Sequence, residues 1–313
     1  MNFDKTGLTP IVCVLGATGS GKNDLALELS RNFSLEIINF DSRQVYKGLE
    51  IITAQPSPED KKLCAHHLYG FLEINKGISA GKFTEMASSA INKTASRKKL
   101  PFLVGGTGLY LRSLIYGLAE IPKIPDQIIK DIQKELSNHG IETLYQELSR
   151  VDPVYSSTIT ARDRQKISRA LGVYRTTGEP ISKWHERQNK KPRYKALLLG
   201  IKTDLEELTP FLALRIEKMI GRGAIDEVQR AYEYSGQNFS LPGFSGIGCR
   251  EIISYIEKEM DLQQAKSLWL KNTRAYAKRQ ITWFRKEPGI IWTAPGDFSK
   301  ASMQVEKFLK NVF

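Results

Sequence analysis

Short apolar runs alternate with segments of helical periodicity over much of the chain. The runs predict strands at 11–15, 35–40, 67–72, 101–104 and 196–201. Apolar positions recur at helical spacing between these runs, over 22–32, 80–97 and 107–117. Strands that alternate with helices are typical of a parallel sheet with helices on its faces. The sequence therefore predicts an α/β core.

The pattern changes between residues 119 and 195. Pro122 and Pro125 interrupt the chain there, and no convincing strand follows. Helical periodicity instead predicts helices at 126–138, 141–149, 162–177 and 179–188. After the strand at 196–201 the chain reads as helical again, at 205–220, 223–233, 247–257 and 261–284, with a loop rich in Gly, Ser and Pro at 237–248. This pattern predicts a helical insertion and a helical C-terminal part.

A glycine-rich turn directly follows the first apolar run and opens a helix. It fits G-x-x-x-x-G-K-[ST] at every position except the last, and it consists of Gly16, Ala17, Thr18, Gly19, Ser20, Gly21, Lys22 and Asn23. Backbone N–H groups of such a turn, the helix N-terminus and the lysine all attract an anion. Asn23 replaces the hydroxyl that usually holds Mg²⁺, so its amide oxygen is the candidate metal ligand. The turn predicts a phosphate or pyrophosphate site; a purely structural glycine turn is the alternative.

With this motif, the predicted fold is a P-loop NTPase-like parallel sheet core with an inserted all-helical domain and a helical C-terminal part. The core comprises residues 1–118 and 196–313, and the insertion comprises residues 119–195. Two further polar turns follow strands of this core. Asp41-Ser42-Arg43-Gln44 follows the second strand, and Gly105-Gly106-Thr107-Gly108 follows the fourth. Ligands of such sheets collect at the strands' carboxyl ends, so we expect the three turns to form one crevice. Structural roles for Asp41 in an Asx turn and for Thr107 as a helix cap are the alternatives.

The basic residues of the chain gather in three runs. Lys and Arg number 46 against 34 Asp and Glu, a formal net charge of +12. The runs are 162–175, 183–195 and 271–286, and aromatic residues lie among them. Basic and aromatic residues together favour a nucleic-acid partner over three ordinary solvated helix faces. Trp283 and Phe284 follow a helical pattern and are expected to be buried.

Other features narrow the setting of the protein. No apolar run approaches the length of a membrane span, so no membrane association is expected. Cys13, Cys64 and Cys249 are far apart and odd in number, which suits a reducing, cytoplasmic compartment better than a disulfide framework or a metal site.

Six blocks of the chain are distinctive: DSRQVYKG at 41–48, TAQP at 53–56, VGGTGLYL at 104–111, VDP at 151–153, DRQKISRAL at 163–171 and AKRQITWFR at 277–285. Together they resemble the bacterial tRNA dimethylallyltransferase family, whose members transfer an isopentenyl group to the adenosine beside the anticodon. The resemblance extends from about Ile11 to Trp292 and covers nearly the whole chain.

This resemblance implies a reaction. A dimethylallyl group passes from dimethylallyl pyrophosphate to the exocyclic amine of the adenosine 3′-adjacent to the anticodon, in tRNAs that read codons starting with U. Asp41 is implied as the general base for the poorly nucleophilic amine, and Thr107 as the group that aims it. Lys22 and Mg²⁺ are implied to stabilise the charge that develops on the leaving pyrophosphate.

The resemblance also implies binding residues and partners. The phosphate loop and Arg250 would hold the pyrophosphate of the donor. The adenosine would be flipped out of the anticodon loop into a channel, while the helical insertion clamps the anticodon stem-loop of tRNA and the enzyme acts as a monomer. The implied tRNA-binding residues are Asp41, Ser42, Arg43, Gln44, Gln165, Lys166, Ile167, Ser168 and Arg169, with the segment 245–250 beside them.

Three positions depart from the family pattern: Asn23, Ile52 in place of the usual Gly, and Cys249 in place of the usual Tyr. They leave three alternatives. One is an isopentenyltransferase of free adenine nucleotides, which would not need the insertion or the basic runs. Another is a small-molecule kinase, which the blocks around Asp41 and Thr107 disfavour. The third is a tRNA-binding paralogue whose chemistry is weakened through Asn23.

Overall fold

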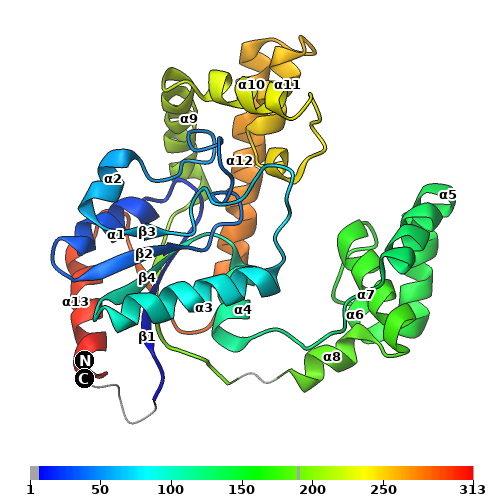
Figure 1. Ribbon diagram of the computed structural model, residues 1–313, viewed down its shortest axis with the longest axis horizontal. Coiled ribbons are helices and arrows are strands. Elements are labelled where there is room, and N and C mark those ends of the chain that lie inside the picture. The colour runs from blue at the N-terminus through cyan, green and yellow to red at the C-terminus, as the bar shows by residue number, and fades with distance from the viewer. Residues whose placement is uncertain (1–6, 189–190, 313) are drawn as a thin grey trace. The chain divides into compact units, whose positions relative to one another are not determined.

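Six parallel strands form one sheet, in the spatial order β3-β2-β4-β1-β5-β6. Figure 1 labels β3, β2, β4 and β1 of this sheet. The computed structural model describes residues 7–188 and 191–312. The strands are β1 (Pro10–Leu15), β2 (Leu35–Asn39), β3 (His66–His67), β4 (Leu100–Gly105), β5 (Lys195–Ile201) and β6 (Ile290–Thr293). This arrangement confirms the predicted α/β fold.

Helices cover the sheet, as the continuous apolar character of the strands requires. Helices α1 (Lys22–Ser30) and α13 (Phe298–Lys310) pack on one face. Their buried residues there are Leu25, Ala26, Leu29, Ala301 and Val305. Helix α3 (Ala80–Ser96) packs against β2 and β4. Every residue of β1, β2 and β4 is buried, so both faces of the central sheet are covered.

A second core lies in the helical C-terminal part. It is built from α9 (Leu205–Gly221), α10 (Ala224–Tyr234), the 3₁₀ helix η1 (Pro242–Ser245), α11 (Cys249–Ile256) and α12 (Leu262–Arg285). Phe244 and Trp269 are buried in it together with Val45, Leu49 and Ile52. The segment that follows β2 is therefore built into the helical core. Two further helices lie earlier in the chain: α2 (Pro58–Leu63) between β2 and β3, and α4 (Gly108–Tyr116) after β4.

The chain divides into two compact units, Met1–Ile115 with Pro192–Phe313, and Tyr116–Lys191. The predicted domain boundaries are at 118/119 and 195/196. Parts of the predicted domains lie outside the described residues, namely 1–6, 189–190 and 313. Lys190 of the second basic run is among them. The second unit contains α5 (Asp126–Val151), α6 (Pro153–Ser156), α7 (Arg164–Thr177) and α8 (Ile181–Arg187), and no strand among its described residues. Helix α5 is kinked at Gly140, between the two helices expected there.

Several elements differ from the prediction. The strand expected at 67–72 is reduced to His66–His67, because Leu68 and Gly70 adopt positive φ values and end the extended backbone. Strand β6 and helix α13 were not predicted; β6 is short and preceded by a Pro-Gly pair. The predicted 237–248 loop contains η1, and Phe244 within it is wholly buried. Trp283 is 39% exposed instead of buried, whereas Phe284 is buried as predicted.

None of the helices among the described residues is both long and apolar enough to cross a bilayer.

A buried carboxylate ties the edge of the sheet together. Glu36 of β2 is almost wholly buried and accepts hydrogen bonds from Arg97, His67 (2.8 Å) and Thr94 (2.9 Å), with Lys99 at 3.3 Å. Burial raises the pKa of Glu36, but these donors outweigh it and bring the pKa down to about 2. The network holds the strand that leads into the Asp41 turn.

We expect Glu36→Gln to lower the free energy of unfolding by about 3 kcal/mol at pH 7, since each unit of pKa shift corresponds to about 1.4 kcal/mol. Because the pKa is lower in the folded state, this contribution is full above the ordinary pKa of 4.5 and is lost as pH falls toward 2. Urea unfolding of wild type and variant from pH 7 down to about pH 2 measures it. Glu85→Gln, in an exposed pair with Lys82, is the matched control; equal losses in both variants at pH 7 would contradict the expectation.

Candidate functional site

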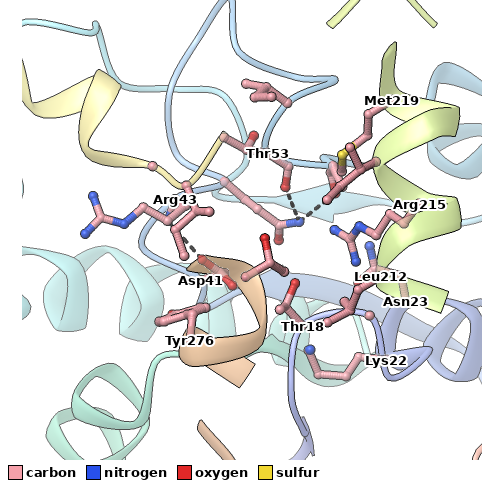
Figure 2. Close-up of a pocket in the computed structure, with 18 of the residues that line it drawn as sticks. Thr18, Lys22, Asn23, Asp41, Arg43, Thr53, Leu212, Arg215, Met219 and Tyr276 are labelled. Atoms are coloured by element: carbon pink, nitrogen blue, oxygen red, sulfur yellow. Dashed lines mark hydrogen bonds between the residues drawn. The ribbon is translucent and has the colours of Figure 1, made fainter. Parts of the chain in front are cut away.

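Three polar turns meet at one edge of the sheet because β2, β4 and β1 are neighbours. They surround a cavity of about 600 Å³. Thr18 and Lys22 line it from the turn after β1, Asp41 and Arg43 from the turn after β2, and Gly105 from the end of β4. The expected crevice is confirmed for the first two turns, whereas the third turn lines it only through Gly105. Figure 2 shows Lys22, Asn23 and Arg215 on one side of the pocket and Asp41, Arg43 and Tyr276 on the other.

The glycine-rich loop presents only part of its length to the pocket. Its lining residues are Thr18, Gly19, Gly21, Lys22 and Asn23. Gly19 has φ 79°, and a Cβ there would lie 2.6 Å from Leu212 Cδ2, so α9 packs directly on the loop.

Three members of the predicted phosphate-binding set, Gly16, Ala17 and Ser20, do not line the pocket. Ala17 is buried against Leu208, Leu212 and Ala277. The Ser20 hydroxyl is buried beneath the loop, 2.7 Å from where a Cβ on Gly16 would be. These residues shape the loop from behind.

Two half-buried cations, Lys22 and Arg215, line the pocket beside the loop. The Lys22 Nζ donates to the Ala17 carbonyl at 2.7 Å. Burial lowers the pKa of Lys22 to about 8; the Asp41 carboxylate opposes this shift and Arg215 adds to it. Burial also lowers the pKa of Arg215, against the pull of Asp41 and Asp24. Two neighbouring cations that are both partly removed from water form a site for a multiply charged anion.

Arg215 is a site residue that the sequence analysis missed. It lies in α9, within an amphipathic pattern, where an arginine reads as part of a solvated face. A signal did exist: α9 directly follows the strand β5 that neighbours β1. Without the packing of α9 on Gly19, that signal does not place the side chain.

Asp41 is held in an Asx turn and still lines the pocket. Its Oδ1 accepts the Arg43 N–H at 2.9 Å, and its own N–H donates to Asn39 Oδ1 at 2.7 Å. The other oxygen, Oδ2, lies 3.5 Å from where a Cβ on Gly106 would be. The structural and functional interpretations of this aspartate are therefore compatible, because one carboxylate oxygen serves the turn and the other does not.

Thr107 lies behind the turn instead of lining the pocket. Its Oγ1 accepts the Ser42 N–H at 3.0 Å and shares a hydrogen bond with the Tyr276 phenol. Tyr276 of α12 does line the pocket. Burial and the neighbouring Asp41 raise the pKa of Tyr276, so the phenol stays protonated. Tyr276 is the polar group exposed beside Asp41, with Thr107 as its support.

The side chains after Asp41 close the pocket on its acidic side. Arg43 donates a hydrogen bond to the Ser245 hydroxyl. Gln44 Nε2 donates to the carbonyls of Thr53 (3.1 Å) and Ala54 (2.6 Å), so its amide N–H groups hold the neighbouring loop. Ser42 is not a lining residue.

Apolar residues form the remaining wall of the cavity. They come from α9, α12 and two loops, and comprise Ile52, Leu212, Ile216, Met219, Ile247 and Trp269. Ile52 fits against Trp269 and the bare backbone of Gly248, where a Cβ would lie 2.8 Å from Ile52 Cδ1. The wall offers a short hydrocarbon group a place between the cations and Asp41.

Other predicted binding residues lie elsewhere. Arg250 is exposed in the first turn of α11 and does not line the pocket; Cys249 beside it is wholly buried, and burial raises its pKa to about 12. In the helical unit, Gln165, Lys166 and Arg169 are exposed on α7 and Ser168 is half-buried. Ile167 is fully buried in that unit's core, so its side chain is a core residue and not an RNA contact.

Among the described residues, no group of three or more His, Cys, Asp or Glu side chains is placed to hold a metal ion. Asn23 and Asp24 both line the pocket beside Lys22. Mg²⁺ commonly keeps several waters and binds through one or two protein oxygens together with substrate phosphates. The donor set fits Mg²⁺ in that mode, in which Asn23 and Asp24 would supply the protein oxygens.

Known proteins resemble this chain over almost its full length. The chain is 49% identical to the tRNA dimethylallyltransferase of Maridesulfovibrio salexigens, over 96% of this chain and 97% of that protein. It is 41% identical to the tRNA dimethylallyltransferase of Lawsonia intracellularis, over 99% and 100%.

Solved structures agree with these relatives. The tRNA Δ(2)-isopentenylpyrophosphate transferase of Staphylococcus epidermidis superposes with a TM-score of 0.69 at 29% identity, over 96% of this chain and 99% of that one. A eukaryotic dimethylallyltransferase described as acting on tRNA gives 0.81 at 26% identity, over 96% and 77%. The family model described as IPP transferase matches residues 44–287, from the Asp41 turn to the end of α12. The chain therefore belongs to the IPP transferase family.

Proposed function

We propose that this protein transfers a dimethylallyl group from dimethylallyl pyrophosphate to the exocyclic amine of the adenosine 3′-adjacent to the anticodon, in tRNAs that read codons starting with U. One observation carries the proposal: Lys22 and Asp41 line the same cavity. A pyrophosphate cradle and a proton acceptor are thus within reach of one pair of reactants. The names of the relatives support tRNA as the acceptor.

The cationic side of the pocket suits the leaving group. When the allylic C–O bond breaks, its electron pair stays on the pyrophosphate oxygen. Lys22, Arg215 and the free amides of the loop would stabilise that charge as it develops. Mg²⁺ held by pyrophosphate, Asn23 and Asp24 would add positive charge there. The apolar wall would keep water from the allyl group.

The acidic side suits the acceptor. The adenine amine forms the new N–C bond and must lose a proton, which Asp41 would accept. The Tyr276 phenol beside Asp41 would hold the adenine in place, with Thr107 behind the phenol. In the overall reaction the allylic C–O bond of the donor breaks and releases pyrophosphate, and the amine exchanges one hydrogen for the allyl carbon. Because adenine must reach a carboxylate inside the pocket, it has to be flipped out of its loop.

The remaining residues suit a tRNA. Ser42, Arg43 and Gln44 flank the base-binding side, and the exposed Gln165, Lys166 and Arg169 of α7 would contact the anticodon stem-loop. Such an acceptor favours this proposal over free adenine nucleotides. We further infer that the protein acts as a monomer in the cytoplasm, where the unpaired Cys13, Cys64 and Cys249 would stay reduced.

Labelled dimethylallyl pyrophosphate tests the proposal. The protein is incubated with unmodified tRNA, with AMP or with no acceptor, and we expect label in tRNA alone. Label in AMP alone would indicate the nucleotide enzyme, and tRNA binding without transfer would indicate a paralogue that has lost its chemistry.

The same assay with tRNA tests the metal. EDTA should stop transfer and added Mg²⁺ should restore it; transfer at full rate in EDTA would remove the metal from the proposal.

We expect Asp41→Asn to lower the turnover number about 10²–10⁴-fold, the usual contribution of a general base. The tRNA dissociation constant should stay within about threefold, because asparagine can keep the Oδ1 acceptor for the Arg43 N–H. Single-turnover transfer and filter binding separate the two quantities. Unchanged turnover would exclude Asp41 as the base. Asp60→Asn, in the capping box of α2, controls for a general effect of losing a carboxylate.

The pKa of Lys22 predicts how donor binding depends on pH. Above about 8 the free protein holds Lys22 neutral, so pyrophosphate must bring a proton with it. Its affinity should fall with rising pH, approaching tenfold per unit above pH 8. Lys22→Arg, which stays charged, should flatten this dependence. Calorimetry with pyrophosphate between pH 7 and pH 9.5 measures both proteins. Parallel curves for the two would contradict the assignment of this proton to Lys22.

A further inference from the structure

One buried amide joins the two sides of the site. Gln280 of α12 is 4% exposed. Its Oε1 accepts the Thr18 N–H of the phosphate-binding loop at 2.8 Å. Its Nε2 donates to the Gly106 carbonyl in the turn after β4 at 2.9 Å. A single planar group therefore bridges two turns that are widely separated in sequence.

The surroundings leave Gln280 little freedom. A Cβ on Gly106 would lie 2.0 Å from Gln280 Nε2, so only glycine lets the amide approach this closely. Ala277, one turn earlier in α12, is fully buried against Ala17. This contact sets the distance between the helix and the phosphate-binding loop. A buried amide that loses either partner leaves a backbone group unpaired, which is costly.

Thr18 lines the pocket, and Gly106 lies directly behind it. Thr18 is adjacent to Gly19, against which α9 packs. The Thr18 N–H donates to Gln280, so it does not bind pyrophosphate as the sequence analysis implied. Gly106 lies next to Asp41 Oδ2 and precedes Thr107. A movement of one turn would be passed through the amide to the other.

We propose that Gln280 is a positioning residue that fixes the spacing between the pyrophosphate cradle and the turn that backs Asp41. This inference rests on the proposed function of the site. Transfer needs the allyl carbon and the amine in line at close range, and a displacement of about 1 Å costs roughly 10²-fold in rate. The bridge sets that geometry without touching either substrate.

Two substitutions test the bridge. Gln280→Met keeps the length of the side chain and removes both hydrogen bonds. Gln280→Glu keeps an acceptor for the Thr18 N–H, and its protonated form can also donate to the Gly106 carbonyl. Burial raises the pKa of such a carboxyl group, so protonation occurs in an accessible pH range. Gln263→Met, at an exposed position in the first turn of the same helix, is the matched control.

We expect Gln280→Met to lower kcat for tRNA about 10–100-fold and to weaken pyrophosphate binding, measured by calorimetry, about tenfold. Gln263→Met should change neither. The ratio of Gln280→Glu to wild-type activity should rise as pH falls from 8 to 6, because the protonated carboxyl group restores both bonds. This recovery also shows that the variant is folded.

Wild-type pyrophosphate affinity and kcat in Gln280→Met, or a Gln280→Glu ratio that does not change with pH, would overturn the inference and reduce Gln280 to packing. Failure of the proposed function is recognised separately. In that case the wild type transfers no label to tRNA, while pyrophosphate binding still reports whether the Gln280 bridge holds the loop.

Discussion

The site depends on two half-buried cations that face one carboxylate. Burial lowers the pKa of Lys22 and of Arg215, and Arg215 lowers the pKa of Lys22 further. The Asp41 carboxylate opposes both shifts only in part. An anion with several charges fits such a pocket best, and it would restore the full charge of Lys22. The chemistry we propose follows from that imbalance, since the anion is also the leaving group.

The helices after the sheet create this imbalance. A phosphate loop at the end of a strand is normally open to solvent above its amides. Here α9 packs on Gly19, and α12 packs on Ala17. Together they cover part of Lys22, bring in Arg215 and supply the apolar wall. The sheet therefore provides the anion site, and the helical C-terminal part converts it into a partly enclosed pocket suited to an apolar group.

The sequence predicts the parts of the site that are local. The loop from Gly16 to Asn23 and the turn at Asp41 follow buried strands, and parallel strands bring their carboxyl ends together. Arg215, Tyr276 and Gln280 could not be found this way. They lie on amphipathic helices where a polar residue ordinarily faces solvent, and only tertiary packing turns them inward. Ile167 shows the reverse error, because a residue inside a basic block turned out to face the core.

Packing also explains how the departures from the family pattern bear on the site. Cys249 is wholly buried in the helical core. A cysteine in place of the family's tyrosine therefore puts a smaller side chain at a position that faces this core. Ile52 occupies the space over Gly248 and beside Trp269, with its N–H held by the buried Glu227 at 2.8 Å, and it extends the apolar wall. Asn23 alone changes the polar side of the pocket. Lys22 and Arg215 supply two charges there whatever residue stands at position 23, and an amide oxygen can still act as a ligand of Mg²⁺, so asparagine at that position is compatible with an active enzyme.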